Sequence, residues 1–133
     1  MKGDIKMADT KLAGKIIDLP LVTGGHFIEN SEKRIVYGPD QFWDDYVMRC
    51  FTLHPGAASA THSHPWCHWS VCISGEGKFK IGDEVFEYSN GYYAHVPENV
   101  PHNFWNASET EDLVLLCIVP KEGDVNPLTQ GFC

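Results

Sequence analysis

The sequence predicts an all-β fold, and three observations carry that prediction. Short runs of apolar or alternating residues are spread along the chain, enough for about eight to ten strands. The 12 glycines and 8 prolines punctuate these runs and act as turn residues. No segment keeps a 3.6-residue apolar period over three turns, so we expect no long helix. Short strands at this spacing are typical of a barrel or a sandwich.

The expected strands follow one another from residue 15 to residue 119. They cover 15–19, 34–37, 46–54, 66–74, 78–81, 84–88, 92–96, 102–105 and 113–119. Gly82 and Asp83 separate two of them and suit the positive backbone angles of a two-residue hairpin turn. We expect a mobile, polar segment over 1–14 and a single domain over 15–120. Residues 121–133 form a tail that extends over the surface or packs on a partner subunit.

The composition excludes several classes of protein. Lys and Arg number 10 and Asp and Glu 18, a formal net charge of −8, so we expect no nucleic-acid partner and no attachment to anionic membranes. No apolar run is long enough to span a bilayer, and the first residues lack the apolar core of a secretory signal. The five cysteines form no Cys-x-x-Cys pair, which argues against a disulfide framework. We therefore expect a cytoplasmic protein.

Four of the seven histidines have a spacing that places them on one face. Side chains alternate along a strand, so His62 and His64 point the same way, and His68 shares their parity. His102 must come from another strand. Imidazole is a common ligand of mid-series divalent metals, and an ion would compensate the cost of burying several rings in one interior. The alternative is that these histidines lie at the surface or are buried and satisfied by hydrogen bonds.

Two spaced motifs surround these histidines. The first is Gly56-x5-His62-x-His64-x3-His68-x6-Gly75, and the second is Gly91-x5-Pro97-x-Asn99-x2-His102-x3-Asn106. In both spacing and order they resemble the two motifs of the cupin superfamily, over about residues 45–120. That resemblance implies a small double-stranded β-helix, the jelly-roll barrel of cupins. His68 stands where the family usually has Glu. Asn99 stands where it usually has Gly, and Asn tolerates the left-handed conformation better than most residues.

A closer resemblance is to the small single-domain cupins with four histidine ligands, some of which bind manganese. The stretches YVMRCFTLHPG, HSHPWCH and LLCIVPKEG are similar to that group. The resemblance implies that the metal ligands are His62, His64, His68 and His102. It also implies manganese or iron, with zinc or nickel as alternatives, and oxidative cleavage of carbon–carbon double bonds by a peroxide. Four neutral rings leave the full charge on the ion, and an octahedral ion keeps two positions for substrate.

Parity suggests further residues around this site. Phe104 shares the face of His102, and Ser70 and Cys72 share the face of His68, as does Trp66 if no bulge intervenes. For Phe104 and Cys72 the alternative is core packing, as for most buried aromatics and thiols. Arg49 interrupts an apolar strand, and it either points outward into solvent or points inward to hold a substrate carboxylate.

The resemblance to the four-histidine cupins implies that Arg49 points inward and that Cys117 lies near the metal. A thiol in that place could be oxidised by a metal-bound peroxide. His95 is expected in the core or at a rim, with a pocket acid–base role as the alternative. Trp69 has outward parity and indicates a subunit interface, so we expect a homodimer.

Three functions remain open at this stage. The first is a metal-dependent oxidoreductase, dioxygenase-like or peroxide-using, acting on a small organic substrate. The second is non-redox Lewis-acid chemistry, as in an isomerase, a lyase or a cyclase. The third is a module that binds a sugar or a small acid without turning it over, because neither motif contains a catalytic carboxylate.

Overall fold

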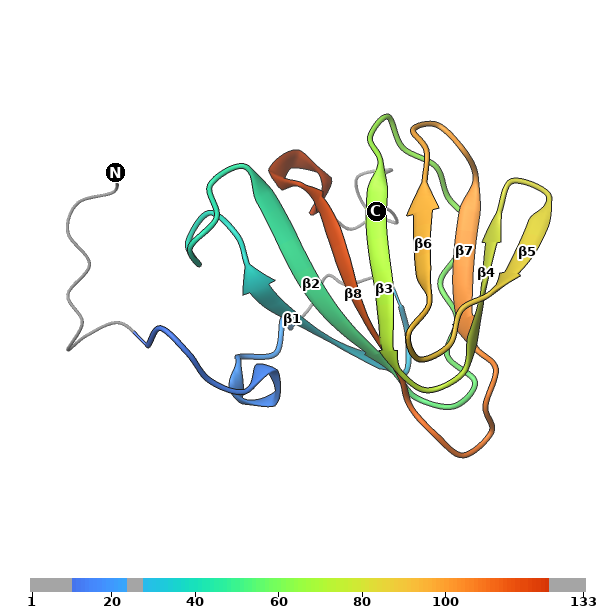
Figure 1. Ribbon diagram of the computed structural model, residues 1–133, viewed down its shortest axis with the longest axis horizontal. Helices are drawn as coiled ribbons and strands as arrows, with labels where there is room; N and C mark the ends of the chain where they lie inside the picture. Colours follow the sequence, from blue (N-terminus) through green and yellow to red (C-terminus); the bar gives the residue numbers. More distant parts are fainter. Residues whose placement is uncertain (1–10, 24–27, 125–133) are drawn as a thin grey trace.

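The chain folds into two antiparallel sheets, as shown by a computed structural model that describes residues 11–23 and 28–124 (Figure 1). The strands are β1 (Ser31–Tyr37), β2 (Tyr46–Leu53), β3 (His68–Ser74), β4 (Gly77–Ile81), β5 (Glu84–Glu87), β6 (Tyr93–Val96), β7 (His102–Asn106) and β8 (Leu113–Pro120). A five-stranded sheet has the order β1-β2-β8-β3-β6, and a three-stranded sheet has the order β5-β4-β7. The predicted all-β class is confirmed.

One predicted strand is wrong. Residues 15–19 contain a short 3-10 helix, η1 (Ile16–Asp18), instead of a strand. The amide of Asp18 bonds to the carbonyl of Lys15, and no residue of η1 is buried. An apolar run becomes a strand only where another strand can pair with it and a core can cover it. Here the first strand-like pairing comes later, as a bridge between Leu21 and Arg34.

The core lies between the two sheets, and alternation along the strands builds it. In β8 every second residue from Leu113 to Val119 is buried, and the residues between them are half-buried. Phe51 of the neighbouring strand β2 and Phe79 of β4, in the facing sheet, belong to the same core cluster. This period of two is what an apolar inner face requires. Because the same pattern is present in β3 and β7, His68 and His102 also point into the interior.

Turns with positive φ connect the strands near the site. Gly82 has φ +62° between β4 and β5, as expected for the hairpin. Asn99 has φ +63° in the loop before β7, and its amide bonds to the carbonyl of His64. Asn thus takes the left-handed conformation that the resemblance assigns to Gly at this position, and the turn is preserved.

The ends of the described chain lie beside the sheets. A second 3-10 helix, η2 (Lys121–Gly123), follows β8, and Gly123 packs so tightly against Trp66 that a Cβ there would lie 2.5 Å from the indole nitrogen. The expected mobile segment falls largely on residues 1–10, and most of the expected tail falls on 125–133, both outside the described residues. No helix in the described ranges has the length and apolarity that crossing a bilayer requires.

Candidate metal centre

The four histidines singled out in the sequence come together at one end of the sheets. His68 and His102 are the first residues of β3 and β7, and each is 1% exposed. His62 pairs with His102 through reciprocal backbone hydrogen bonds of 3.1 and 2.9 Å. His64 lies two residues further along and is 2% exposed. Segments far apart in sequence therefore deliver four rings to one place.

Three of these rings form a compact group. Ligand nitrogens of His62, His64 and His102 all lie within 4.8 Å of one another. His68 is outside that group of three but lies against it, with its ring stacked on His64 at a centroid distance of 4.4 Å and its centroid 5.1 Å from that of His102. The prediction that His68 shares the face of His62 and His64 therefore agrees with the packing.

The hydrogen bonds of the rings select one tautomer. The Nδ1 atoms of His62, His64 and His102 lie 2.7, 2.8 and 2.8 Å from the carbonyl oxygens of Ala60, Trp66 and Val100. A carbonyl can only accept, so each Nδ1 carries the hydrogen. In a neutral ring the other nitrogen, Nε2, is then left with its lone pair. This is the form in which imidazole binds a metal, held by a backbone acceptor.

The remaining nitrogens supply the test of whether a metal suits this site. The Nε2 atoms of His64, His68 and His102 are buried and make no hydrogen bond within the described residues. Buried polar atoms normally have partners, and leaving several without one in the same place is costly. Converging lone pairs on neutral rings are a donor set that suits a divalent transition metal.

The rings also resist protonation. Burial lowers the pKa of His64 to about 4 and that of His102 to about 4, because the charged form loses its hydration. Burial likewise holds the pKa of His68 well below its usual value, and the charge of Arg49 adds to this effect. The pKa of His62 is lowered for the same main reason. At neutral pH the cluster is uncharged and its Nε2 atoms are available.

Arg49 and Cys117 lie directly behind His68. Arg49 is 1% exposed, so it points inward, one of the two placements that the sequence left open. Its Nη2 donates to the Sγ of Cys117 at 3.1 Å, and that sulfur lies 3.2 Å from the Nδ1 of His68. The guanidinium also sits 5.2 Å from the centre of the Phe51 ring and 3.6 Å from the carboxylate of Asp124. Arg49 thus connects the outer carboxylate to the histidine cluster.

Phe104 lies on the same face as His102, as its parity predicted, and is 2% exposed. Its ring packs on Phe79 and Phe51, at centroid distances of 5.2 and 6.5 Å. These contacts are those of a core residue. A role for Phe104 in lining a substrate pocket remains a prediction from the sequence.

Two further residues lie around the site: Trp66, which parity predicted on the face of His68, and Asp124, which no pattern predicted. The Trp66 ring is stacked on His64, 4.9 Å away and only 9° from parallel, and its carbonyl accepts the hydrogen of the same imidazole. Asp124 lies 2.7 Å from the amine of Lys33 as well as beside Arg49. Parity predicted Trp66 on the face of His68 within the strand expected over 66–74, but β3 begins at His68, so the stacking of Trp66 on His64 arises from tertiary packing. Asp124 stands in the expected tail, where no pattern marked it.

The other histidines have different surroundings. His95 is exposed on β6, 5.9 Å from the Trp69 ring, and so is a rim residue. His54 lies between Asp112, at 2.9 Å, and Glu32, at 3.2 Å. His26 lies outside the described residues.

Comparisons with solved structures agree with this fold. A polyketide cyclase, RemF, from Streptomyces resistomycificus is similar with a TM-score of 0.73 and 17% identity, over 84% of this chain and 80% of that one. A predicted oxalate decarboxylase from Thermotoga maritima gives a TM-score of 0.70 and 14% identity, over 82% and 98%. A cupin-2 domain from Rhodospirillum rubrum gives 0.65 and 19%, over 77% and 68%.

The sequence comparisons have two outcomes. No curated protein matches the chain. The family model described as the cupin domain matches residues 49–119, which include both histidine motifs. The chain therefore belongs to the cupin family.

Proposed function

We propose that the protein binds one divalent transition metal ion through His62, His64, His68 and His102, and that it is a metal-dependent oxidoreductase acting on a small organic substrate. The observation that carries the proposal is the set of buried Nε2 atoms of His64, His68 and His102. Backbone hydrogen bonds hold His64 and His102 in the metal-binding tautomer, and His68 packs beside them. Manganese or iron is the favoured ion, since both bind imidazole and change oxidation state.

The metal, when bound, supplies a Lewis acid that can also exchange electrons with oxygen or a peroxide. The chain's own residues prepare the place for it. The carbonyls of Ala60, Trp66 and Val100 hold three rings in the tautomer with the hydrogen on Nδ1. Burial disfavours a second proton on Nε2, so that nitrogen keeps its lone pair. In this proposal Arg49 holds a positive charge behind His68, where it favours a substrate with a carboxylate or enolate oxygen.

Non-redox Lewis-acid chemistry is the second candidate. The observation that favours it is the similarity in fold to a polyketide cyclase, which extends over 84% of this chain. Four neutral ligands also suit an ion that only polarises a carbonyl. The two candidates predict different responses to a change of metal.

The test compares the manganese, iron and zinc forms of the protein with a panel of enolates, phenols and alkenes. Consumption of oxygen or peroxide by the manganese or iron form, and none by the zinc form, is the expected result. Turnover that survives in the zinc form, with no consumption of oxidant, would favour the Lewis-acid candidate. Recovery of every compound unchanged from all three forms would contradict both enzymatic candidates, the oxidoreductase and the Lewis-acid enzyme. It would leave the binding module as the remaining function.

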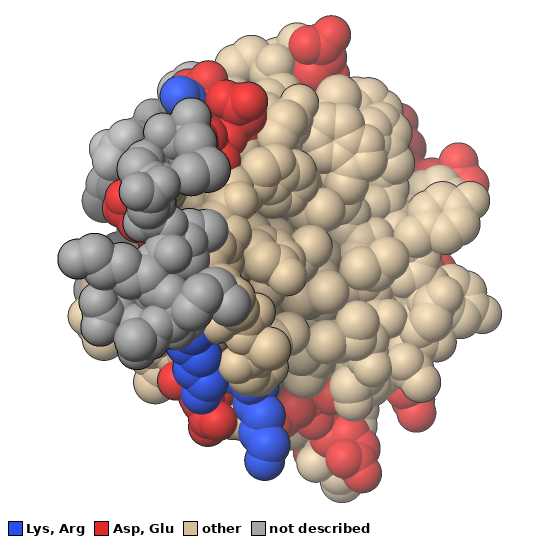
Figure 2. Space-filling view, turned by 60° about the vertical axis from the view of Figure 1, so that its left-hand side comes forward, with Lys and Arg blue, Asp and Glu red and all other residues tan. Residues whose placement is uncertain are grey.

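We also propose a homodimer formed by the outer face of the five-stranded sheet. In register across β2, β8, β3 and β6, one row of outward side chains is Met48, Ile118, Trp69 and His95, and the next is Leu116, Val71 and Tyr93, with the buried Cys50 at its β2 end. Neither row contains a carboxylate or an amine, and Figure 2 shows a broad uncharged area with acidic residues at its margins. Trp69 and Val71 are each 42% exposed, and Tyr93 is 80% exposed.

A second copy is the occupant that the charge distribution favours. Around a two-fold axis the same patch faces its own copy, so an uncharged patch on a chain of net charge −8 avoids self-repulsion. Sedimentation should show a dimer that Val71→Glu converts to a monomer, while Val85→Glu, at an exposed site on β5, leaves it intact. A monomeric wild-type protein would contradict the proposal.

Two coarser assignments complete the proposal. We keep residues 15–120 as one cupin domain and the cytoplasm as its compartment. The free thiols Cys50, Cys67, Cys72 and Cys117 are consistent with a reducing environment.

A further inference from the structure

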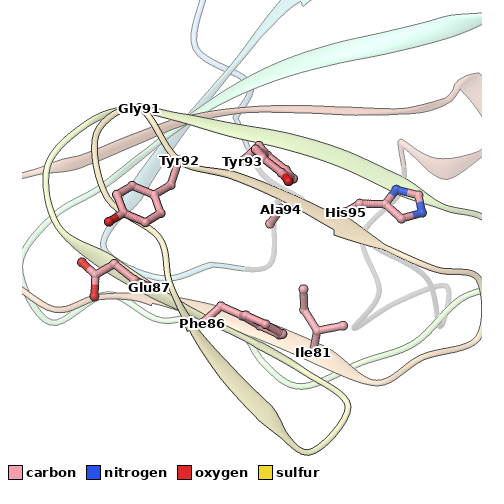
Figure 3. Close-up of a pocket in the computed structure, with 8 residues that line it drawn as sticks. All are labelled: Ile81, Phe86, Glu87, Gly91, Tyr92, Tyr93, Ala94 and His95. Atoms are coloured by element: carbon pink, nitrogen blue, oxygen red, sulfur yellow. The ribbon is translucent and has the colours of Figure 1, made fainter.

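A cleft opens beside β6, at the edge of the outer face just described, and Tyr93 and His95 of that face also line it. It lies between β6, which ends the five-stranded sheet, and β4 and β5, of which β5 ends the three-stranded sheet. Its volume is about 590 Å³, which is within the range of small-molecule sites. Figure 3 shows Tyr93, Ala94 and His95 along one wall, with Phe86 and Ile81 along the other.

The cleft extends inward between the edges of the two sheets, because some of its lining residues belong to the core side of their strands. Ala94 is 7% exposed and belongs to the core side of β6. Ile81 packs against the core, and it lies two residues after the buried Phe79, on the same face of β4. Phe86 pairs with Phe79 across β4 and β5, so it lies on the same face of the sheet, where its side chain is 42% exposed at the cleft. The small side chain of Ala94 is what leaves room between these walls.

Both walls end beside the histidine cluster. On β4, Ile81 is the cross-strand partner of His102. On β6, Val96 is the cross-strand partner of His68, and it follows two residues after Ala94. Such partners share a face of the sheet, and their Cα atoms lie about 4.5–5.5 Å apart. The inner end of the cleft is therefore separated from the cluster by little more than the side chain of Ile81.

The lining indicates the class of ligand. Phe86, Tyr92 and Tyr93 contribute aromatic rings, and among the described residues neither Lys nor Arg lines the cleft. Its carboxylate, from Glu87, already binds the amine of Lys78 at 2.6 Å. Rings of this kind favour a flat, apolar, conjugated body, which stacks on them or meets them edge to face. A charged ligand would find no opposite charge along these walls.

We propose that this cleft binds a flat aromatic or conjugated substrate that carries one terminal oxygen donor, with the body against Phe86 and the aromatic rim and the oxygen directed past Ile81 to the histidine cluster. The inference rests on the proposed metal centre and names its substrate class. It makes Phe86 a binding residue and Ile81 the residue that sets how closely a substrate approaches.

The first experiment tests the cleft without metal. 2-Naphthol, a flat ring system with one hydroxyl, is titrated against the metal-free protein and followed by its fluorescence. Phe86→Ala should weaken binding about fivefold or more, since an aromatic contact is lost. Val85→Ala is the matched control, because Val85 is 52% exposed and faces outward on the same strand. Equal affinities for the Phe86 variant and the wild-type protein would overturn the proposal.

The second experiment tests the connection to the cluster. The protein is loaded with Mn²⁺, its metal content is measured, and the paramagnetic relaxation of the naphthol protons is recorded. Strong relaxation in the wild-type protein, reduced in Ile81→Phe, is the expected result, with metal content unchanged. Bound naphthol without relaxation in a manganese-loaded protein would overturn the link. A protein that takes up no Mn²⁺ but still binds naphthol through Phe86 would refute the proposed metal centre and keep the cleft as a ligand site.

Discussion

The four-histidine cluster and His54 lie at opposite ends of the five-stranded sheet. Their comparison shows how the surroundings of an imidazole decide its protonation. His68 begins β3 at the end of the sheet where β2 also begins, with β8 between these two strands, whereas His54 follows the end of β2. In the cluster, burial lowers the pKa values of the rings and keeps them neutral, although hydrogen bonds to backbone carbonyls act in the opposite direction. At His54, the hydrogen bond that the ring donates to Asp112 raises the pKa, and Glu32 adds to this effect. The same side chain resists protonation in one place and takes up a proton more readily in the other.

The largest effect that this comparison predicts is on metal binding. His102→Ala removes one buried Nε2 donor, and we expect the affinity for Mn²⁺ to fall roughly 100-fold or more. Elemental analysis after gel filtration measures the loss, and circular dichroism checks that the sheets remain. His54→Ala is the control, since it removes a histidine of the opposite kind and should retain the metal. Equal metal content in both variants would contradict the assignment of the ligands.

The two ends also predict opposite effects of pH on the stability of the metal-free protein. The pKa of His64 is lowered from 6.5 to about 4, so between these values the unfolded chain binds more protons and unfolding is favoured as the pH falls. The same holds for His102, and each ring should account for on the order of 3 kcal/mol. Urea unfolding at a series of pH values, with and without bound metal, would measure this loss.

For His54 the sign is reversed. Its pKa is raised above 6.5, so its stabilisation is complete below 6.5 and disappears as the pH rises through the folded value. The group is about one third exposed, and solvent screens its contacts, so the effect is small.

A metal-free protein whose stability does not change between pH 4 and pH 6.5 would show that the histidine cluster is not buried as described.

Asp124 tests whether a carboxylate supports the cluster as it supports His54. It binds Lys33 at 2.7 Å and lies 3.6 Å from Arg49, and it contacts no histidine in the hydrogen bonds and ion pairs of the described residues. Asp124→Asn should lower the free energy of unfolding by about 1–3 kcal/mol, because Lys33 loses its charged partner. Metal content should be unchanged. A variant that lost its metal would show that this carboxylate acts on the cluster through Arg49.

The smallest effect is expected at Asp112. Asp112→Asn removes the main cause of the raised pKa of His54, so that pKa should fall toward 6.5. The change in stability should be only a few tenths of a kcal/mol, as is usual for exposed pairs. An NMR titration of the His54 ring measures the shift, with Glu109→Gln, at another exposed carboxylate, as the control. An unchanged titration would mean that Glu32 alone holds the charge.

Much of the fold and of the site was accessible from the sequence. Alternation in 113–119, the Gly82-Asp83 turn and the punctuation by glycine predict strands whose positions the structure confirms. Parity also predicts that Phe104 lies on the face of His102. These features are local, since they depend on a period of two and on backbone angles that each residue carries with it. The strand expected at 15–19 failed because a local run says nothing about whether a partner strand exists.

Other features were decided only by tertiary structure. Parity left Arg49 free to point either way, and the packing of β2 against β8 places it beside Cys117 and His68. The tautomer of the rings depends on carbonyls of Ala60, Trp66 and Val100, which carry no signal because every residue has one. The partnership of Ile81 with His102 arises from strand register. The alternation of residues in the sequence determined which side chains share a face of a strand. Long-range strand pairing determined which of these side chains meet, because no single strand contains information about its distance from the others.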